Sequence, residues 1–178
     1  MSSAIATSGA LPQTYANKTP NVQIDDVSIA FELKPVLTNL SFAVQPGQTL
    51  ILLGPAGTGK SVLLKLVNGL LKPDSGSIRI FGQEITTMPR RDLYKLRAHI
   101  GMVFQESALF DSLSVEDNVA YRLHEERVPE AQAHARVVEA LKFVELEDAI
   151  SKFPSELSGG MRRRVSIARA IITNPDLI

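Results

Sequence analysis

The chain has 178 residues, of which 44% are apolar and 21% are charged, and its formal net charge at pH 7 is zero. This composition is typical of a globular domain and excludes an intrinsically disordered chain. Zero net charge without a basic stripe argues against nucleic acid as a partner, and the lack of cysteine excludes disulfides and thiolate metal sites, which fits a reducing cytosol.

The N-terminal part of the chain is expected to be a tail followed by a small β region. Residues 1–20 are rich in Ser, Ala, Thr, Pro and Gly without periodicity, which predicts disorder. The start lacks the basic and apolar regions of a secretory signal, and no later apolar run approaches the roughly 18 residues of a membrane span. From Val22 to Val44, two strand patterns precede a turn at Pro46-Gly47.

The next segment contains a phosphate-binding loop. Residues 54–61 satisfy the pattern G-x-x-x-x-G-K-[ST] at every required position. The apolar run Thr49–Leu53 before the loop is expected to be a short buried strand, and the apolar run 62–67 after it a helix. A chance glycine turn is the alternative, and these flanks argue against it. Strand, loop and helix would aim N–H groups and a helix dipole at one anion, while Lys60 contacts the outer phosphates and Ser61 ligates Mg²⁺. The residues predicted to bind a nucleoside triphosphate are Gly54, Pro55, Ala56, Gly57, Thr58, Gly59, Lys60 and Ser61.

Short elements are expected between this helix and residue 105. Ser77–Phe81 alternates in polarity as a strand does, and Arg90–Ala98 reads as a charged helix or turn. The apolar run Ile100–Phe104 is expected to be a strand that ends at Gln105.

The following 50 residues, about 107–156, are expected to be mostly helical, with Pro129 at a helix start. One face of the helix after Pro129 is predicted to contain Ala135, Val138, Leu141 and Val144 or Glu145. The loop after Gln105 carries apolar side chains suited to docking a partner, at Leu109, Phe110, Leu113 and Val115. The alternative is that these belong to the helical core, and we expect this of two of the four.

A second motif precedes the last helix. In Leu157–Met161, Ser158 is a good N-cap, and Gly159 and Gly160 allow the backbone to approach a ligand closely at a helix start. The helix is predicted to bury a stripe formed by Val165, Ala168 and Ile172. An ordinary capped helix is the alternative for this motif alone, and the phosphate loop upstream argues against it.

Together these motifs resemble those of ABC ATPases. The signature of that family is LSGGQ followed by a helix resembling QRVAIARAL; here Met161 replaces the glutamine, while Arg164-Val165 and Ala168–Ala170 keep the pattern. The resemblance implies an α/β fold, C-terminally incomplete, in which a P-loop NTPase core carries an antiparallel β subdomain and an inserted α-helical subdomain. The partial ATP-binding domain would span residues 21–178, with the helical subdomain at about 107–160.

The resemblance also implies roles for residues outside the loop. Phe31 is at the spacing of the aromatic that stacks on adenine, and Gln105 is at that of the glutamine that touches Mg²⁺ and the attacking water. The alternatives are a core ring and a polar residue at a strand end. The implied catalytic residues are thus Lys60 and Gln105, and the implied Mg²⁺ ligands are Ser61 and Gln105. Ser158, Gly159 and Gly160 of a second subunit would close on the γ-phosphate of ATP, so the family pattern implies a homodimer.

The hydrolytic residues of the family follow a sequence resembling Asn174–Ile178. They are an aspartate that binds Mg²⁺ at the end of an apolar strand, a glutamate beside it and a switch histidine. Asp176 is at the start of that strand and does not replace the aspartate, and the three histidines all precede the signature motif. We therefore expect either part of a longer transport ATPase or a fragment that binds ATP, and no turnover by the 178 residues alone.

Within the family, the chain resembles the Mla-type phospholipid transport ATPases of bacteria. The resemblance rests on Gln105–Val115, Asp117–Tyr121 and Pro154–Met161, and methionine at position 161 is usual in that branch. The implied partners are an integral membrane permease, whose helix docks beside the helical subdomain, and an Mce-domain lipid-binding protein. The implied location is cytoplasmic and peripheral on the inner membrane through the permease. Amino-acid importers share several motifs and are the alternative; soluble ABC proteins of DNA repair or translation are disfavoured by the neutral charge and single signature.

Overall fold

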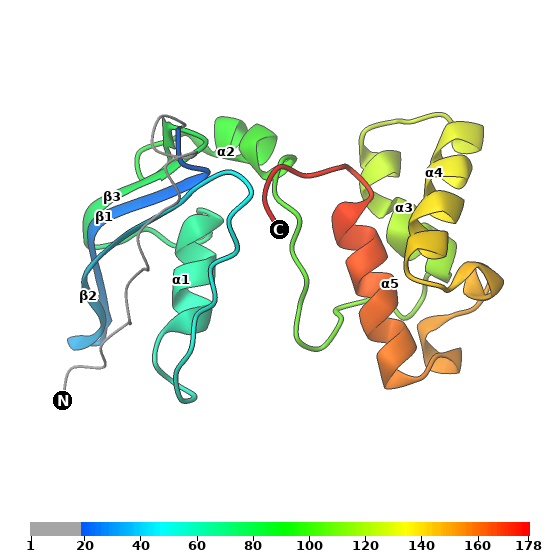
Figure 1. The fold of residues 1–178 in the computed structure, drawn as a ribbon, viewed down its shortest axis with the longest axis horizontal. Helices are drawn as coiled ribbons and strands as arrows, with labels where there is room; N and C mark the ends of the chain where they lie inside the picture. The colour runs from blue at the N-terminus through cyan, green and yellow to red at the C-terminus, as the bar shows by residue number, and fades with distance from the viewer. Residues whose placement is uncertain (1–18) are drawn as a thin grey trace. The chain divides into compact units, whose positions relative to one another are not determined.

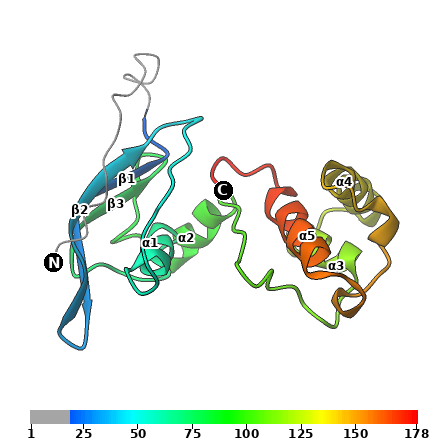
Figure 2. The same ribbon diagram turned by 60° about the horizontal axis from the view of Figure 1, so that its bottom comes forward.

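The computed structural model describes residues 19–178, which divide between residues 94 and 95 into two compact units (Figures 1 and 2). The first contains β1 (Val22–Phe31), β2 (Lys34–Val44), α1 (Lys60–Val67), β3 (Ser75–Ile80) and β4 (Gln83–Glu84). Helix α2 (Arg90–Arg97) crosses the division. The second contains α3 (Val115–Glu125), α4 (Glu130–Phe143), η2 (Glu147–Ala149), η3 (Pro154–Glu156) and α5 (Gly159–Ile171). The predicted disordered tail lies outside the described residues except for Thr19 and Pro20.

The strands of the first unit form one antiparallel sheet in the order β2-β1-β3-β4. Strand β1 buries Val22 and Ile24, then Val27 and Ile29, so its alternation changes phase once. The phase changes at Asp26, whose φ of 49° and shifted register mark a bulge. Helix α1 packs against β3 through its buried residues Leu63, Leu66 and Val67. The strands expected within residues 22–44 and 77–81 are therefore confirmed, apart from small differences at their ends.

Two predicted strands do not form in the described residues. Thr49–Leu53 has no β partner, and the side chains of Ile51 and Leu53 are 72% and 86% exposed, so the expectation of a buried strand is wrong here. In Ile100–Phe104 the only pairing is an isolated parallel bridge from Ile100 to Leu177. A strand requires a neighbouring chain that accepts and donates its backbone hydrogen bonds, and apolar composition alone does not supply that neighbour.

The core of the second unit lies where α3, α4 and α5 pack together. The stripe predicted for α5 is confirmed, since Val165, Ala168 and Ile172 are all buried. None of the helices formed by residues 19–178 is both long and apolar enough to cross a bilayer.

The face predicted for α4 is partly wrong. Pro129 does start the helix, as expected, but Ala135 and Val138 are exposed. The buried face is formed by Ala133, Val137, Ala140 and Leu141, with Val144 just after the helix. Alanine and valine occur all round this helix, so several overlapping stripes have similar apolar character, and the positions of α3 and α5 decide which one is buried.

Candidate nucleotide-binding site

The phosphate loop, residues 54–61, is anchored near its end and open in its middle. Gly57 and Gly59 have φ values of 83° and 89°, in the left-handed region that favours glycine. A Cβ added to Gly59 would lie 3.0 Å from side-chain atoms of both Val36 and Leu37, whereas one added to Gly57 would meet nothing within 4 Å. The loop therefore rests against β2 at Gly59, while its backbone at Gly57 faces open space that an anion can enter.

Helix α1 begins without a side-chain cap. Its N-cap is Gly59, its first turn contains no acidic residue, and its first hydrogen bond runs from the Leu63 N–H to the Gly59 carbonyl at 2.8 Å. The first N–H groups of any helix lack partners inside it and lie at the positive end of the helix dipole. This helix start is therefore suited to receive a phosphate group.

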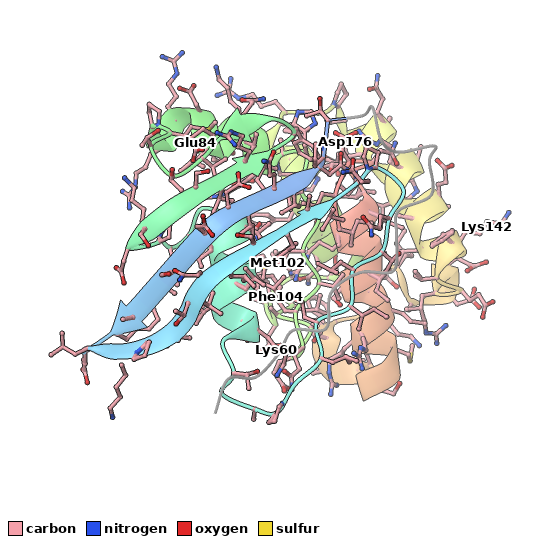
Figure 3. All side chains as sticks on the ribbon, turned by 60° about the vertical axis from the view of Figure 1, so that its left-hand side comes forward. Lys60, Glu84, Met102, Phe104, Lys142 and Asp176 are labelled. Carbon is pink, nitrogen blue, oxygen red and sulfur yellow. The ribbon has the colours of Figure 1, made fainter. Side chains whose placement is uncertain are left out.

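The Lys60 side chain folds back over the loop from the start of α1 (Figure 3). Its ammonium donates to the carbonyl oxygens of Gly54 at 2.7 Å and Pro55 at 2.5 Å, and lies 3.3 Å from the Thr58 hydroxyl. That hydroxyl in turn donates to the Pro55 carbonyl at 3.0 Å. Among the described residues no carboxylate forms an ion pair with Lys60. The positive charge of Lys60 is thus bonded only to neutral oxygens in the loop. An anionic ligand can neutralise it.

The Ser61 hydroxyl suits a magnesium ion that binds together with phosphate. Ser61 is exposed in the first turn of α1. Within residues 19–178 no group of three or more His, Cys, Asp or Glu side chains is arranged to hold a metal ion. Mg²⁺ is commonly held by one or two protein oxygens together with substrate phosphates and waters. The residues present therefore fit Mg²⁺ that arrives with a nucleotide.

Phe31 ends β1 at the hairpin that leads into β2. Its ring is 44% exposed, and Phe31 pairs with Lys34 across the hairpin. Val36, two residues after Lys34 on β2, lies next to Gly59, so this strand joins the hairpin of Phe31 to the phosphate loop. The ring is too exposed for a core residue of the first unit, and its stacking on adenine stays a prediction.

Gln105 and the signature motif lie in the second unit. Gln105 is exposed, in a segment without regular secondary structure. Ser158 is the N-cap of α5, as predicted, and its hydroxyl accepts a hydrogen bond from the Met161 N–H at 3.2 Å. Gly159 and Gly160 are exposed, and no acidic residue occupies the first turn of the helix. This helix start is therefore also suited to an anion, while the nucleotide contacts of these residues stay predictions.

The loop after Gln105 divides as expected between core and surface. Val115 is fully buried and Leu109 packs against the core of the second unit. Phe110 is half-exposed, and its ring lies 4.8 Å from that of Tyr121, centroid to centroid. A cavity of about 330 Å³ opens beside this aromatic pair and is lined also by Met102, Phe104 and Arg122.

The sequence interpretation missed the residue that shapes this loop. The amide of Asn118 is fully buried in α3 and bonds to backbone groups of Phe110, Leu113 and Ser114. A signal was available, because Asn118 is an amide within the apolar run formed by Val115, Val119 and Ala120.

Comparisons with known proteins identify the family. Residues 37–178 match the family model described as ABC transporter. The methionine import ATP-binding protein MetN of Corynebacterium glutamicum is 45% identical over 142 residues, which are 80% of this chain and 39% of that protein. The intermembrane phospholipid transport system ATP-binding protein MlaF of Escherichia coli K12 is 42% identical over 169 residues, which are 94% of this chain and 62% of MlaF.

The fold agrees with solved ATP-binding cassettes. The dimeric post-hydrolysis structure of the cassette MJ0796 bound to ADP and Pi matches with a TM-score of 0.80 and 31% identity, over 86% of this chain and 70% of that one. The present chain spans less than two thirds of the length of both curated relatives. Because the family model covers most of the chain and the fold is that of the cassettes, the chain belongs to the ABC transporter family and forms part of an ATP-binding domain of that family.

Proposed function

We propose that the phosphate loop of this chain binds ATP with Mg²⁺ and that the protein is the ATP-hydrolysing subunit of an ABC transporter. The observation that carries the proposal is the Lys60 ammonium held by the Gly54 and Pro55 carbonyls beside the uncapped start of α1. A positive charge and unpaired N–H groups at one place form a site for an anion of high charge.

Different residues of the first unit would bind different parts of the nucleotide. Phe31 would stack on adenine, the loop N–H groups would surround the phosphates, and Lys60 would leave its carbonyl partners for the outer phosphates. Charge on the transferring phosphoryl group would then be stabilised by the Lys60 ammonium without further rearrangement of the loop. Bound Mg²⁺, held in part by Ser61, would neutralise phosphate charge. We also propose, from the family resemblance, that Gln105 contacts Mg²⁺ and orients the attacking water.

A second subunit would complete the site. We propose that Ser158, Gly159 and Gly160 of a partner copy present the start of their α5 to the γ-phosphate, so that ATP joins two subunits in a homodimer. The absence of an acidic residue from the first turn of α5 supports this role, because such a residue would repel phosphate. The MJ0796 structures, which are dimers, support the same arrangement by similarity.

Coupling to a membrane would occur through a permease. We propose that a permease helix docks on the second unit at the cavity beside Phe110 and Tyr121, where exposed rings and Met102 offer apolar contact. The protein would then be cytoplasmic and peripheral on the inner membrane.

For the transported substrate we propose phospholipid, with an Mce-domain lipid-binding protein as a further partner. The alignment with MlaF covers 94% of this chain and that with the MetN of Corynebacterium efficiens covers 93%, so coverage does not separate the two substrates and the proposal rests on the resemblance at position 161. Met161 follows the two signature glycines, as is usual in the Mla-type branch. The second candidate is amino-acid import, which the 45% identity with the MetN of C. glutamicum favours.

Transport by the full-length protein decides between these substrates. The protein is reconstituted with its permease in liposomes, and ATP-dependent transfer of labelled phospholipid is compared with uptake of labelled methionine. Phospholipid transfer that is lost in Lys60→Met supports the proposal, while methionine uptake with no lipid transfer assigns the second candidate. If the full-length protein neither binds nor hydrolyses ATP, the proposed function is wrong.

A further inference from the structure

Arg169, near the end of α5, bonds to the backbone two and three residues after Gln105. Its Nη1 donates to the Ala108 carbonyl at 2.7 Å and its Nη2 to the Ser107 carbonyl at 2.9 Å. The planar guanidinium suits two acceptors that face the same side. Burial lowers the pKa of the Arg169 guanidinium, yet an arginine stays protonated at neutral pH, so both bonds are charge-assisted.

The backbone that Arg169 holds has an uncommon conformation. Ser107 and Ala108 are consecutive non-glycine residues with φ values of 59° and 48°. The Ala108 N–H donates to the Glu106 carbonyl at 2.6 Å, which closes a γ-turn about Ser107, and this rare, strained turn must be stabilised by its surroundings. The Arg169 guanidinium bonds to the carbonyls of both residues and so supplies a stabilising contact to this turn.

The chain on either side of this turn is also attached to the helices of the second unit. A Cβ added to Gly101 would lie 2.5 Å from the Ala170 carbonyl, so the segment starts in contact with α5. Beyond the turn, the buried Asn118 amide accepts from the Phe110 N–H at 2.8 Å, and the two hydrogens of its NH₂ group are shared among the carbonyls of Phe110, Leu113 and Ser114. Gln105 lies between these attachments and is exposed. Next to it the Ser107 hydroxyl donates to the Glu106 carbonyl at 2.6 Å within the turn itself, and Arg169 bonds the same turn from a helix of this unit.

Helix α5 connects the signature motif at its start to Arg169, whose side chain bonds to the turn after Gln105. From the Ser158 N-cap to Arg169 the helix extends about 16 Å at its regular rise. Val165 and Ala168 between them are fully buried, so the helix is expected to move as one body. The geometry points to Arg169 as a positioning residue that makes the Gln105 segment, residues 104–108, follow the start of α5. This inference rests on the proposed function, in which the start of α5 contacts the γ-phosphate and Gln105 contacts Mg²⁺.

Amide hydrogen exchange in the full-length protein tests the contact itself. The variants are Arg169→Gln, Arg169→Lys and, as a matched control, Arg136→Gln, because Arg136 also bonds a carbonyl of this unit, Ile172 at 2.6 Å, without touching the Gln105 segment. We expect Arg169→Gln to raise exchange in the Gln105 segment about tenfold, Arg169→Lys to raise it less, and Arg136→Gln to leave it unchanged. Unchanged exchange in Arg169→Gln, or equal acceleration throughout α3, α4 and α5 in both Arg169 variants, overturns the inference.

A double-mutant cycle on ATP turnover tests the positioning role. If Arg169 acts through Gln105, Arg169→Gln slows turnover in the wild-type background and has little further effect in the Gln105→Ala background. Additive losses overturn the inference, and Arg136→Gln, combined with Gln105→Ala, provides the additive reference. If the wild-type protein has no turnover, the proposed function fails, whereas the exchange experiment still decides whether Arg169 holds the segment.

Discussion

The ammonium of Lys60 lies 2.7 Å from the carbonyl oxygen of Gly54, so the phosphate loop is closed by its own lysine. Phosphate oxygens are stronger acceptors for an ammonium than neutral carbonyls, because both partners are then charged. We therefore expect Lys60 to exchange these carbonyls for phosphate when a nucleotide binds.

Substituting Lys60 tests that exchange. Lys60→Met is expected to weaken ATP binding about 30- to 150-fold, as the loss of one charge-assisted bond of roughly 2–3 kcal/mol implies. Titration with a fluorescent ATP analogue measures the affinity. Lys65→Met, which removes an exposed lysine from the last turn of the same helix, is the control and should leave the affinity unchanged. Equal losses in both variants would show a general charge effect and contradict a specific role for Lys60.

The two loop glycines with similar φ values are expected to respond differently to alanine. Gly59→Ala places a Cβ 3.0 Å from side chains of Val36 and Leu37, in addition to backbone strain, and should destabilise the fold by about 2–3 kcal/mol. Gly57→Ala meets no neighbour, so only strain of about 1 kcal/mol is expected. Denaturant unfolding measures both. The prediction also requires Gly57→Ala to weaken ATP binding, because its methyl group enters the space left for phosphate; full affinity would contradict that placement.

Phe31 is expected to contribute to nucleotide affinity by stacking. Removing the ring in Phe31→Ala should weaken ATP binding by about 1–3 kcal/mol, while the affinity for inorganic triphosphate, which has no base, stays constant. Phe153→Ala is the matched control, since both rings are 44% exposed. Calorimetric titration with both ligands distinguishes stacking from a general loss of the site, in which both affinities would fall.

Asn118 is expected to be important for stability because its amide is buried and fully engaged. Asn118→Ala leaves the N–H of Phe110 and the carbonyl of Leu113 without this partner, while the Phe110 and Ser114 carbonyls keep backbone donors, and the change should destabilise the fold by about 2–4 kcal/mol. The unfolding midpoint in urea measures this loss. Gln132→Ala removes an exposed amide from α4 and should have little effect. A similar small effect of Asn118→Ala would mean that water replaces the amide in this loop.

Glu84 is expected to make stability depend on acid pH. Burial raises the pKa of Glu84, but hydrogen bonds from Thr86 and the Ile78 N–H, with Arg79 nearby, outweigh burial and lower its pKa below 4.5. A carboxylate with a lowered folded pKa contributes stability that is full above its ordinary pKa and is lost as pH falls through the folded value.

Replacing the Glu84 carboxylate tests whether its pKa is lowered in the folded protein. Glu84→Gln should cost about 1 kcal/mol at pH 7, and the difference from wild type should shrink as the pH falls below about 4.5. Unfolding free energies measured between neutral and acid pH provide the test. Glu139→Gln, at an exposed position on α4, is the control. If the difference in unfolding free energy instead widens toward acid pH, the pKa of Glu84 is raised in the folded protein and the prediction is wrong.

Motifs whose geometry is local could be predicted from the sequence. The loop at residues 54–61 needs glycines at defined φ values, a lysine and a serine, and the start of α5 needs an N-cap, so the chain itself encodes both shapes. The buried stripe of α5 follows in the same way from its period.

Only the tertiary structure decided which side chains meet across long separations. Thr49–Leu53 is as apolar as a buried strand but has no β partner here, and α4 buries a stripe other than the predicted one because α3 and α5 select it. Arg169 bonds to Ser107 across 62 positions in sequence, and no sequence pattern predicts that contact. Hydrogen-bond partners and burial depend on neighbours that packing brings together, so the sequence by itself determined the anion-binding motifs and the family, while the fold decided how the Gln105 segment is held.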